Sequence, residues 1–202
     1  SLGGYGSCDA TLQAAVNAIV SNGSILVIAA GNNNANAANY SPGNCANVIT
    51  VAATNSAGSR SYYSNYGSSV EIAAPGGEQY YSNDPGGVLS TLNTGTTTPA
   101  SDTYIYYQGT SMASPHVAGV VSLMTSVNPY LSPDQVRQLL QSTAKAFPGG
   151  SSCNTSICGS GLVDDYAAVD ASTPQTFYDV LKGHWAASYI VRLYNACITG
   201  GC

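Results

Sequence analysis

The sequence predicts an α/β domain with three layers, in which a mostly parallel sheet carries helices on both faces. Two observations predict this fold class. First, apolar runs of strand length alternate along the chain with longer segments whose apolar residues recur at helical spacing. Second, the strand-like run at 25–30 is apolar throughout and does not alternate with polar residues, as expected of a parallel strand that is covered on both faces.

The individual elements follow from local patterns. Residues 9–22 carry apolar side chains at helical spacing, and Gly23 is placed to end this helix in a left-handed conformation. Residues 25–30 are apolar and rich in β-branched side chains, which predicts a strand buried on both faces. Residues 31–42 are mostly Asn, Ala and Gly, which predicts a loop. The remaining predicted elements are strands at 48–53, 70–74 and 88–92, a helix at 111–124 and a helix from residue 133 onward.

The helix predicted from residue 133 has a complete start signal. Ser132 can cap its N-terminus, Pro133 suits its first turn, and Gln135 can close a capping box with Ser132. The chain also shows no internal repeat, which excludes a solenoid.

The composition describes a weakly charged chain. Hydrophobic residues make up 44% of the 202 residues and charged residues only 7%, so polar uncharged side chains and tyrosines must supply the polar surface, which suits a secreted protein. The net charge of −5 is spread without a block of one sign, so there is no basic footprint for nucleic acid. No apolar run approaches the roughly 18–20 residues of a transmembrane helix.

Six cysteines fall into three sets by position: Cys8 and Cys45, Cys153 and Cys158, and Cys197 and Cys202. Spacing alone does not settle how they pair. No CxxC spacing occurs and neither histidine lies near a cysteine set, which disfavours a zinc site. Disulfides formed in an oxidising compartment are the better interpretation.

The strongest motif is the run Gly-Thr-Ser-Met-Ala-Ser-Pro-His-Val-Ala-Gly at residues 109–119. It places Ser111 after a glycine turn and at the start of a helix, where backbone N–H groups and the positive helix end stabilise developing negative charge. An isolated serine in that position is more often a plain helix cap. The whole run, however, resembles the nucleophile motif of the subtilase (subtilisin-like) family of serine proteases, and this resemblance implies that Ser111 is the catalytic nucleophile.

Further segments resemble the same family in the order that it requires. Residues 29–32, Ala-Ala-Gly-Asn, resemble its oxyanion segment, which implies that the side-chain amide of Asn32 donates to the oxyanion beside the N–H of Ser111. The alternative is a plain turn residue. Residues 1–4, Ser-Leu-Gly-Gly, resemble its substrate-binding strand, whose backbone pairs with an extended peptide. The residues assigned to substrate binding are Ser1, Leu2, Gly3, Gly4, Ala29, Ala30, Gly31 and Thr110. Residues 62–67, 74–76 and 159–164 also fit the family pattern, as parts of its scaffold.

The resemblance covers residues 1–171 and also exposes a departure. A serine nucleophile needs a base within hydrogen-bond reach and a carboxylate that orients the base. In this family both precede the substrate-binding strand, where this sequence begins. His116 follows Ser111 by five residues, about 140° away around a helix, and is expected to be a buried structural histidine. We therefore expect the fold to be incomplete at its N-terminus and the 202-residue chain alone to be inactive.

The resemblance carries two accessory expectations. The chemistry requires no cofactor, but calcium is a candidate structural ion, and Glu71 matches a position where some members place an acidic ligand. A solvated strand residue is the alternative for Glu71. Secreted bacterial relatives also imply a bond between Cys8 and Cys45, and Cys153 and Cys158 are expected to form a local pair.

The last part of the chain differs in character from the rest. Residues 172–202 carry spaced Phe, Asp, Trp, Ile and Leu and then Ile-Thr-Gly, and they resemble the first half of an S-layer homology repeat. Such repeats bind cell-wall polysaccharide. The alternative is a C-terminal amphipathic helix that packs on the protease. The sequence thus predicts a catalytic part at 1–171 and a tail at 172–202.

Two functions from different classes remain. The first is a secreted, bacterial serine endopeptidase that acts on polypeptides and is held at the cell surface by the tail. The second is a non-catalytic peptide- or wall-binding fragment. Ser111 and Asn32 favour the first, because a binding module has no use for an oxyanion hole. A third arrangement is complementation, in which a separate chain supplies the Asp and the His.

Overall fold

The computed structural model describes residues 1–174, 184–186, 189, 190 and 193 of the 202. The chain forms two compact units, Ser1–Ser172 and Thr173–Cys202. Of the second unit only the few residues just named are described, so the predicted S-layer homology repeat and the pairing of Cys197 and Cys202 lie outside the described residues.

The first unit contains helices and short strands in alternation. The helices are α1 (Ala10–Ser21), α2 (Thr110–Val127), α3 (Pro133–Thr143) and α4 (Asp165–Ser172), with a 3₁₀ turn, η1, at Ala37–Asn39. The strands are β1 (Gly4–Tyr5), β2 (Val27–Ala29), β3 (Tyr40–Ser41), β4 (Ile49–Thr54), β5 (Ile72–Pro75), β6 (Val88–Asn93) and β7 (Asp102–Tyr107). None of the described helices is long and apolar enough to cross a bilayer.

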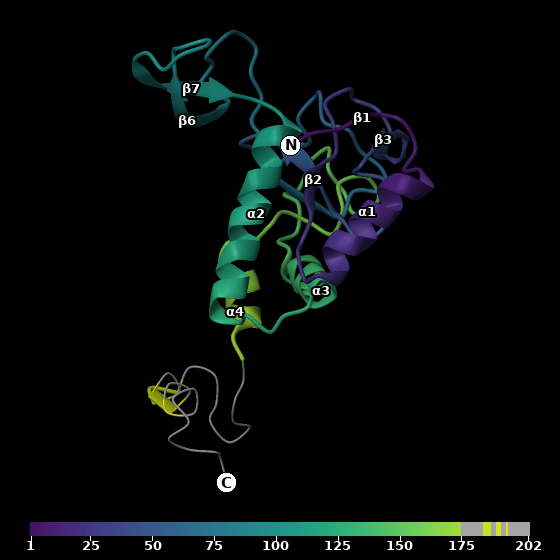
Figure 1. The fold of residues 1–202 in the computed structure, drawn as a ribbon. Helices are drawn as coiled ribbons and strands as arrows, with labels where there is room; N and C mark the ends of the chain where they lie inside the picture. The colour runs from purple at the N-terminus through teal and green to yellow at the C-terminus, as the bar shows by residue number, and fades with distance from the viewer. Residues whose placement is uncertain (175–183, 187–188, 191–192, 194–202) are drawn as a thin grey trace. The chain divides into compact units, whose positions relative to one another are not determined.

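The central sheet is parallel and has the order β2-β4-β5. Residues of β4 that pack on α2 belong to one hydrophobic cluster, together with buried residues of α3 and α4. On the opposite face, α1 packs through a separate cluster that contains Val16 and Val48. The predicted α/β class, with helices on both faces of a parallel sheet, is therefore confirmed (Figure 1).

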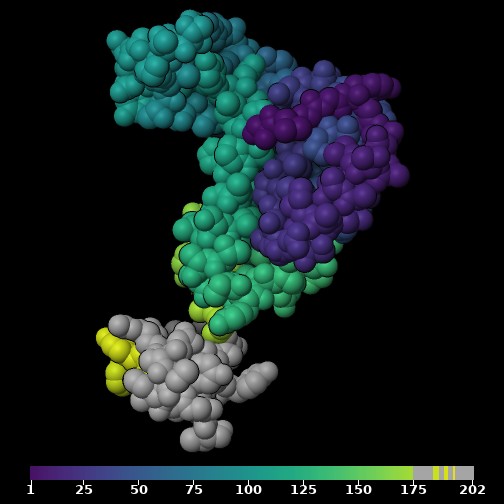
Figure 2. Space-filling view, viewed as in Figure 1, coloured from purple at the N-terminus to yellow at the C-terminus, as the bar shows by residue number. Residues whose placement is uncertain are grey.

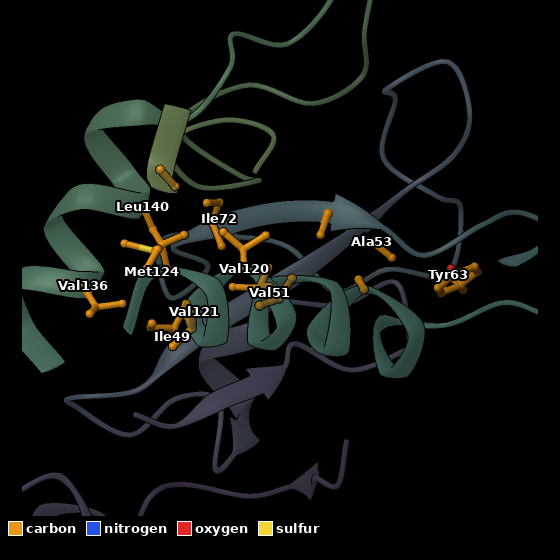
Figure 3. Packing of buried hydrophobic residues seen from close by; sticks show 14 residues of the cluster. Ile49, Val51, Ala53, Tyr63, Ile72, Val120, Val121, Met124, Val136 and Leu140 are labelled. Carbon is orange, nitrogen blue, oxygen red and sulfur yellow. The ribbon is translucent and has the colours of Figure 1, made fainter. Parts of the chain in front are cut away.

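The main core lies between the sheet and α2. Val51 and Ile72 from the sheet and Met124 from α2 are fully buried and meet in this layer, with Leu140 of α3 beside them (Figure 3). Every residue of β4 is buried, Thr50 and Thr54 included, as the sequence predicted for a strand covered on both faces. This packing holds α2 against one face of the parallel sheet.

Helix starts also follow the sequence. Asp9 caps α1 by accepting a hydrogen bond from the N–H of Leu12 at 2.8 Å, and Gly23 follows the helix with a φ of +83°. Ser132 and Gln135 form the predicted capping box at the start of α3.

Two disulfides have the predicted pairing. Cys8 bonds to Cys45 and Cys153 bonds to Cys158. The first joins the segment after β1 to the loop before β4 and belongs to the cluster under α1. The second closes a short loop, and both of its cysteines belong to another buried cluster, which contains Ala73 of the sheet. Both bonds fit the oxidising compartment that the cysteine pattern indicated.

Two expectations about burial are wrong. The strand predicted at 25–30 is shorter, Val27–Ala29, and is half-buried instead of buried on both faces, because within the described residues it pairs only with β4. His116 is exposed and not buried. It lies two helical turns before Leu123, which is 52% exposed, on the same side of α2. Part of the surface of α2 is uncovered in the space-filling view (Figure 2).

Candidate functional site

Ser111 lies in a cleft of about 400 Å³ at the N-terminal end of α2. The structure brings together in this cleft every residue that the sequence assigned to the nucleophile, the oxyanion donor and substrate binding. The lining consists of Ser1, Leu2, Gly3, Gly4, Tyr5, Ala29, Ala30, Gly31, Asn32, Asn33, Tyr40, Ser41, Thr110 and Ser111. These residues come from three segments that are far apart in sequence: the chain start through β1, the end of β2 with the loop after it, and the start of α2.

A glycine turn presents Ser111 to the cleft. Gly109 precedes α2 with a φ of +151°, a conformation that favours glycine. Its N–H donates to the carbonyl of Gly76 at 2.9 Å, which ties the turn to the loop after β5. Ser111 then occupies the second position of the helix, where backbone N–H groups have no acceptor within the helix. The positive end of α2 and these free N–H groups favour negative charge at this point.

The loop after β5 is fixed by a buried tyrosine. The hydroxyl of Tyr63 donates to the carbonyls of Gly76 and Gly77, at 2.9 and 2.7 Å, and burial raises the pKa of Tyr63 to about 12. Gly76 is required here because a Cβ on it would lie 2.4 Å from the Cβ of Ala53. The hydroxyl therefore stays protonated and holds the backbone that positions Gly109.

The side chain of Asn32 has one orientation only. Its Oδ1 accepts from the N–H of Thr110 at 2.8 Å and from the Thr110 hydroxyl at 2.8 Å. Because a backbone N–H can only donate, the atom that faces it must be Oδ1, which leaves Nδ2 as the free end. Among the described residues Nδ2 has no hydrogen-bond partner. Nδ2 and the N–H nitrogen of Ser111 each lie 3.5 Å from the point where a Cβ on Gly109 would stand, so two free donors flank the same place.

Thr110 acts differently from what the sequence led us to expect. Its side chain is fully buried, and its hydroxyl accepts from the N–H of Gly31 at 3.1 Å while donating to Asn32. Thr110 was assigned to substrate binding, but both hydrogen-bonding functions of its hydroxyl are used inside the protein. It borders the cleft and fixes the end of β2 against the start of α2.

Asn65 is a site residue that the sequence analysis missed. It is fully buried, its Oδ1 accepts from the N–H groups of Asn33 and Ala35, at 2.9 and 3.0 Å, and its Nδ2 donates to the carbonyl of Ala30 at 2.9 Å. These three bonds hold the loop that carries Asn32. Gly31 has a φ of +103°, and a Cβ there would lie 2.4 Å from Nδ2 of Asn65, so only glycine allows the approach. The segment 62–67 was taken only as scaffold, and contacts across 30 or more residues leave no local signal that could have revealed this role.

Glu71, the candidate calcium ligand, lies beside a cationic side chain. Its Oε1 is 3.5 Å from Nη1 of Arg137, and a guanidinium at that position repels a cation. Within the described part of the chain no three His, Cys, Asp or Glu side chains gather that could hold a metal ion. The carboxyl is an ion-pair partner that ties the residue before β5 to α3. Burial raises the pKa of Glu71, and the nearby Arg137 opposes that shift only in part.

This arrangement predicts the pH dependence of a variant. With a raised pKa in the folded state, Glu71 contributes stability that is present at low pH and is lost as the pH rises through the folded-state pKa. The Glu71→Gln variant lacks this titration, so its midpoint of urea unfolding should exceed that of the wild type at pH 7–8, and the difference should shrink toward pH 4. Arg137 keeps Asp134 as a partner at 3.1 Å.

The matched control for that experiment is Asp134→Asn, which removes the exposed partner of Arg137 and leaves Glu71 in place. It should not reproduce the pH-dependent gain. A Glu71→Gln variant that is less stable than the wild type at pH 8, or a difference that does not change with pH, would contradict the account.

His116 does not complete the site. Its Nδ1 lies 2.7 Å from the carbonyl oxygen of Met112, one helical turn earlier, so Nδ1 carries the proton and donates to that carbonyl. His116 and Ser111 both border a second hollow of about 330 Å³ on the side of β6, but no hydrogen bond joins them. The described residues thus hold a serine in a cleft with two free hydrogen-bond donors beside it, and no histidine among them bonds to the hydroxyl of that serine.

Comparisons with known proteins agree with this geometry. Residues 1–164 match the model of the subtilase family, peptidase S8. The chain is 52% identical over 173 residues to an extracellular protease of Xanthomonas campestris pv. campestris, which covers 85% of this chain and 28% of that protein. It is 38% identical over 175 residues to an extracellular basic protease of Dichelobacter nodosus, covering 85% of this chain and 27% of that protein.

A solved structure of a protease from Pseudoalteromonas arctica superposes with a TM-score of 0.80 at 54% identity, covering 85% of this chain and 50% of that one. A cold-adapted subtilisin-like serine proteinase superposes with a TM-score of 0.59 at 35% identity, covering 77% of this chain and 51% of that one. The chain thus spans between a quarter and a half of these relatives. By its family match, its nucleophile turn and its fold, the chain belongs to the subtilase family.

Proposed function

We propose that this chain is the nucleophile-bearing part of a secreted bacterial serine endopeptidase that cleaves polypeptides through an acyl-enzyme at Ser111. The observation that carries the proposal is the orientation of Asn32. Thr110 holds its Oδ1, so Nδ2 is left to donate beside the N–H of Ser111, at a helix start and inside a cleft. A merely structural asparagine has no need of that free donor.

The chemistry follows from these positions. The substrate backbone pairs with residues 1–4, and its scissile carbonyl lies over Ser111. As the serine oxygen attacks, the carbonyl oxygen becomes an oxyanion, and Nδ2 of Asn32 and the N–H of Ser111 stabilise it. A base outside these 202 residues takes the serine proton and passes it to the leaving amine, and water then hydrolyses the ester to release the acid and restore Ser111. Each step uses side chains and water, so no cofactor is required.

The base and the acid are proposed to come from residues that do not belong to these 202. Ser111 needs a histidine to accept its proton, and His116 is bonded to Met112 on its own helix. We define the parent protease as the longer protein, or the complex with a complementing chain, that adds this histidine and its aspartate. The isolated chain keeps the oxyanion donors and the cleft but not the activated nucleophile.

The cleft also supports a substrate preference. Ala29, Ala30 and Gly31 line one wall of the pocket for the residue before the scissile bond, and Leu2 and Gly3 line the other. Small side chains leave this pocket open and carry no charge. We expect a broad preference with a bias toward apolar residues.

Casein hydrolysis tests the proposal. The parent protease should digest casein, its Ser111→Ala variant should not, and the purified 202-residue chain should show no activity above that of the variant. The proposal of a missing base fails if the 202-residue chain hydrolyses casein and Ser111→Ala abolishes that activity. Binding of peptides by the parent protease without any cleavage would favour the alternative, a non-catalytic binding protein.

Thr110 offers a further prediction for the parent protease. The Thr110→Val variant keeps the shape of the side chain but leaves the N–H of Gly31 without its acceptor and Asn32 with one donor fewer. We expect kcat to fall about tenfold. The loss of one hydrogen bond that orients the oxyanion donor should raise the activation barrier by about 1.4 kcal/mol, which corresponds to that factor. Kinetics on a chromogenic peptide measure the change.

The control for Thr110 lies on the same helix. Thr125→Val also removes a threonine hydroxyl, but that half-buried hydroxyl bonds, among the described residues, only to carbonyls of α2 itself, at 3.0 and 3.1 Å. Its kcat should stay within about twofold of the wild type, in keeping with the small effects of substitutions away from a site. Equal losses in both variants would show that Thr110 acts only through the stability of α2.

The tail is proposed to attach the protease to the cell wall. This part of the proposal rests on the sequence pattern of residues 172–202 and on the relatives named as extracellular proteases. Sedimentation with purified cell-wall sacculi tests it. The full chain should sediment and a chain that ends at residue 171 should stay in solution; equal behaviour would contradict wall binding.

A further inference from the structure

The backbone carbonyl of Ser111 has lost its helical partner. In an α-helix this oxygen accepts from the N–H four residues later, which here belongs to Pro115, inside α2. Proline has no N–H, so it cannot donate. The nucleophile's own carbonyl must therefore find a donor outside the helix ladder.

Ser1 supplies that donor. Its Oγ lies 3.1 Å from the carbonyl oxygen of Ser111 and 3.1 Å from Oγ of Ser114. Since a carbonyl can only accept, the Ser1 hydroxyl donates to it, and the hydroxyl of Ser114 is then free to donate to Ser1. The side chain of Ser114 is 3% exposed, so one end of this chain of hydrogen bonds is fixed inside the protein.

The bond joins two segments that line the cleft. Ser1 begins the first of them, residues 1–5, and Ser111 belongs to the second, the start of α2, 110 residues away in sequence. In Figure 1 the chain start lies at the N-terminal end of α2. The side chain thus links the segment proposed to bind the substrate to the residue proposed to attack it, directly at the reacting centre.

We propose that Ser1 is a positioning residue, whose hydroxyl replaces the hydrogen bond that Pro115 removes and thereby sets the distance between the substrate-binding segment and Ser111. The inference rests on the proposed function. In that proposal the backbone of residues 1–4 contacts the substrate, and a change of the Ser1 side chain leaves this backbone in place. The loss of the hydroxyl should therefore lower kcat and leave KM unchanged. Ser1→Ala should lower kcat about fivefold, the equivalent of one ordinary hydrogen bond.

Four variants of the parent protease separate positioning from a general structural effect. Ser1→Thr keeps the hydroxyl and should retain most of the activity. In the double variant Ser1→Ala with Pro115→Ala, the new N–H at residue 115 can donate to the Ser111 carbonyl, so kcat should recover. Pro115 is exposed, and its replacement leaves no buried cavity. Ser7→Ala is the control, since Ser7 is an exposed serine of the same segment and does not line the cleft.

A second measurement on the 202-residue chain tests the contact without any activity. Met112 follows Ser111, and the other methionine, Met124, follows a leucine. Labelling serine with ¹³C at the carbonyl and methionine with ¹⁵N therefore gives one carbonyl–amide correlation, from the bond between Ser111 and Met112. The carbonyl shift should move upfield in Ser1→Ala, stay in Ser7→Ala, and return in the double variant.

The outcomes are distinct. A carbonyl shift that Ser1→Ala leaves unchanged overturns the contact. A shift that moves while kcat does not overturns the positioning role, as does a double variant that regains the shift but no activity. If the wild-type parent protease has no activity at all, the proposed function fails, and the carbonyl shift still decides whether Ser1 replaces the missing N–H.

Discussion

The Asn32→Ala variant of the parent protease should lose a factor of about 10²–10³ in kcat, with little change in KM. That range was measured for the corresponding donor of a subtilisin, and the geometry here gives the reason to expect it. Thr110 fixes Oδ1 of Asn32 through two bonds of 2.8 Å, so Nδ2 is already oriented before the reaction and pays no reorganisation as charge develops. Steady-state kinetics on a peptide substrate measure the loss.

Asn39→Ala is the matched control for Asn32. Asn39 is an exposed asparagine of η1 that does not line the cleft, so its loss should leave kcat unchanged. If Asn32→Ala retains more than about a third of the wild-type kcat, the donor contributes less than one ordinary hydrogen bond to the transition state, and the oxyanion assignment is wrong.

Asn65→Ala should destabilise the chain by roughly 2–4 kcal/mol and lower the activity of the parent protease as well. The substitution leaves the carbonyl of Ala30 and the N–H groups of Asn33 and Ala35 without their partner. Only the bond to Ala30 is fully buried, so water can replace part of the loss at Asn33 and Ala35, which keeps the cost below the sum of three fully buried groups. Urea unfolding measures the stability.

Asn55→Ala is the matched control for Asn65→Ala. It shows whether the effect comes from the three bonds of Asn65 or from the loss of any asparagine that organises a loop. Asn55 also organises a turn, by accepting from Ala57 and Ser59 at 3.1 Å each, but its turn lies outside the cleft. It should cost less stability than Asn65→Ala and leave kcat intact. An Asn65→Ala variant with full activity would show that the Asn32 loop does not depend on Asn65.

The sequence allowed much of the framework to be predicted, because those signals are local. The run at 48–53 is mostly apolar and forms most of the buried strand β4, and Ser132 with Gln135 forms the capping box of α3. The segments at residues 1–4, 29–32 and 109–111 were placed together by resemblance, and the structure brings them to one cleft.

The remainder depends on contacts that the local sequence does not contain. Thr110 was assigned to substrate binding, and only the bonds of its hydroxyl to Gly31 and Asn32 reveal that this hydroxyl is used internally. Asn65 was taken as part of the scaffold, and its three partners, which lie 30 to 35 residues away, become known only from the structure. Glu71 matched a ligand position, but Arg137 of α3 lies beside it. Long-range polar contacts of this kind follow from packing and not from periodicity.

Fluorophosphonate labelling of the parent protease, followed by mass-spectrometric mapping of the adduct, tests the central claim most directly. The reagent reacts with a serine whose proton is taken by a base and whose oxyanion is stabilised. We expect a single adduct on Ser111, a far slower reaction in Asn32→Ala, and none on the isolated 202-residue chain. An adduct on another residue, or no adduct on a parent protease that still cleaves peptides, would contradict the assignment of Ser111 as the nucleophile.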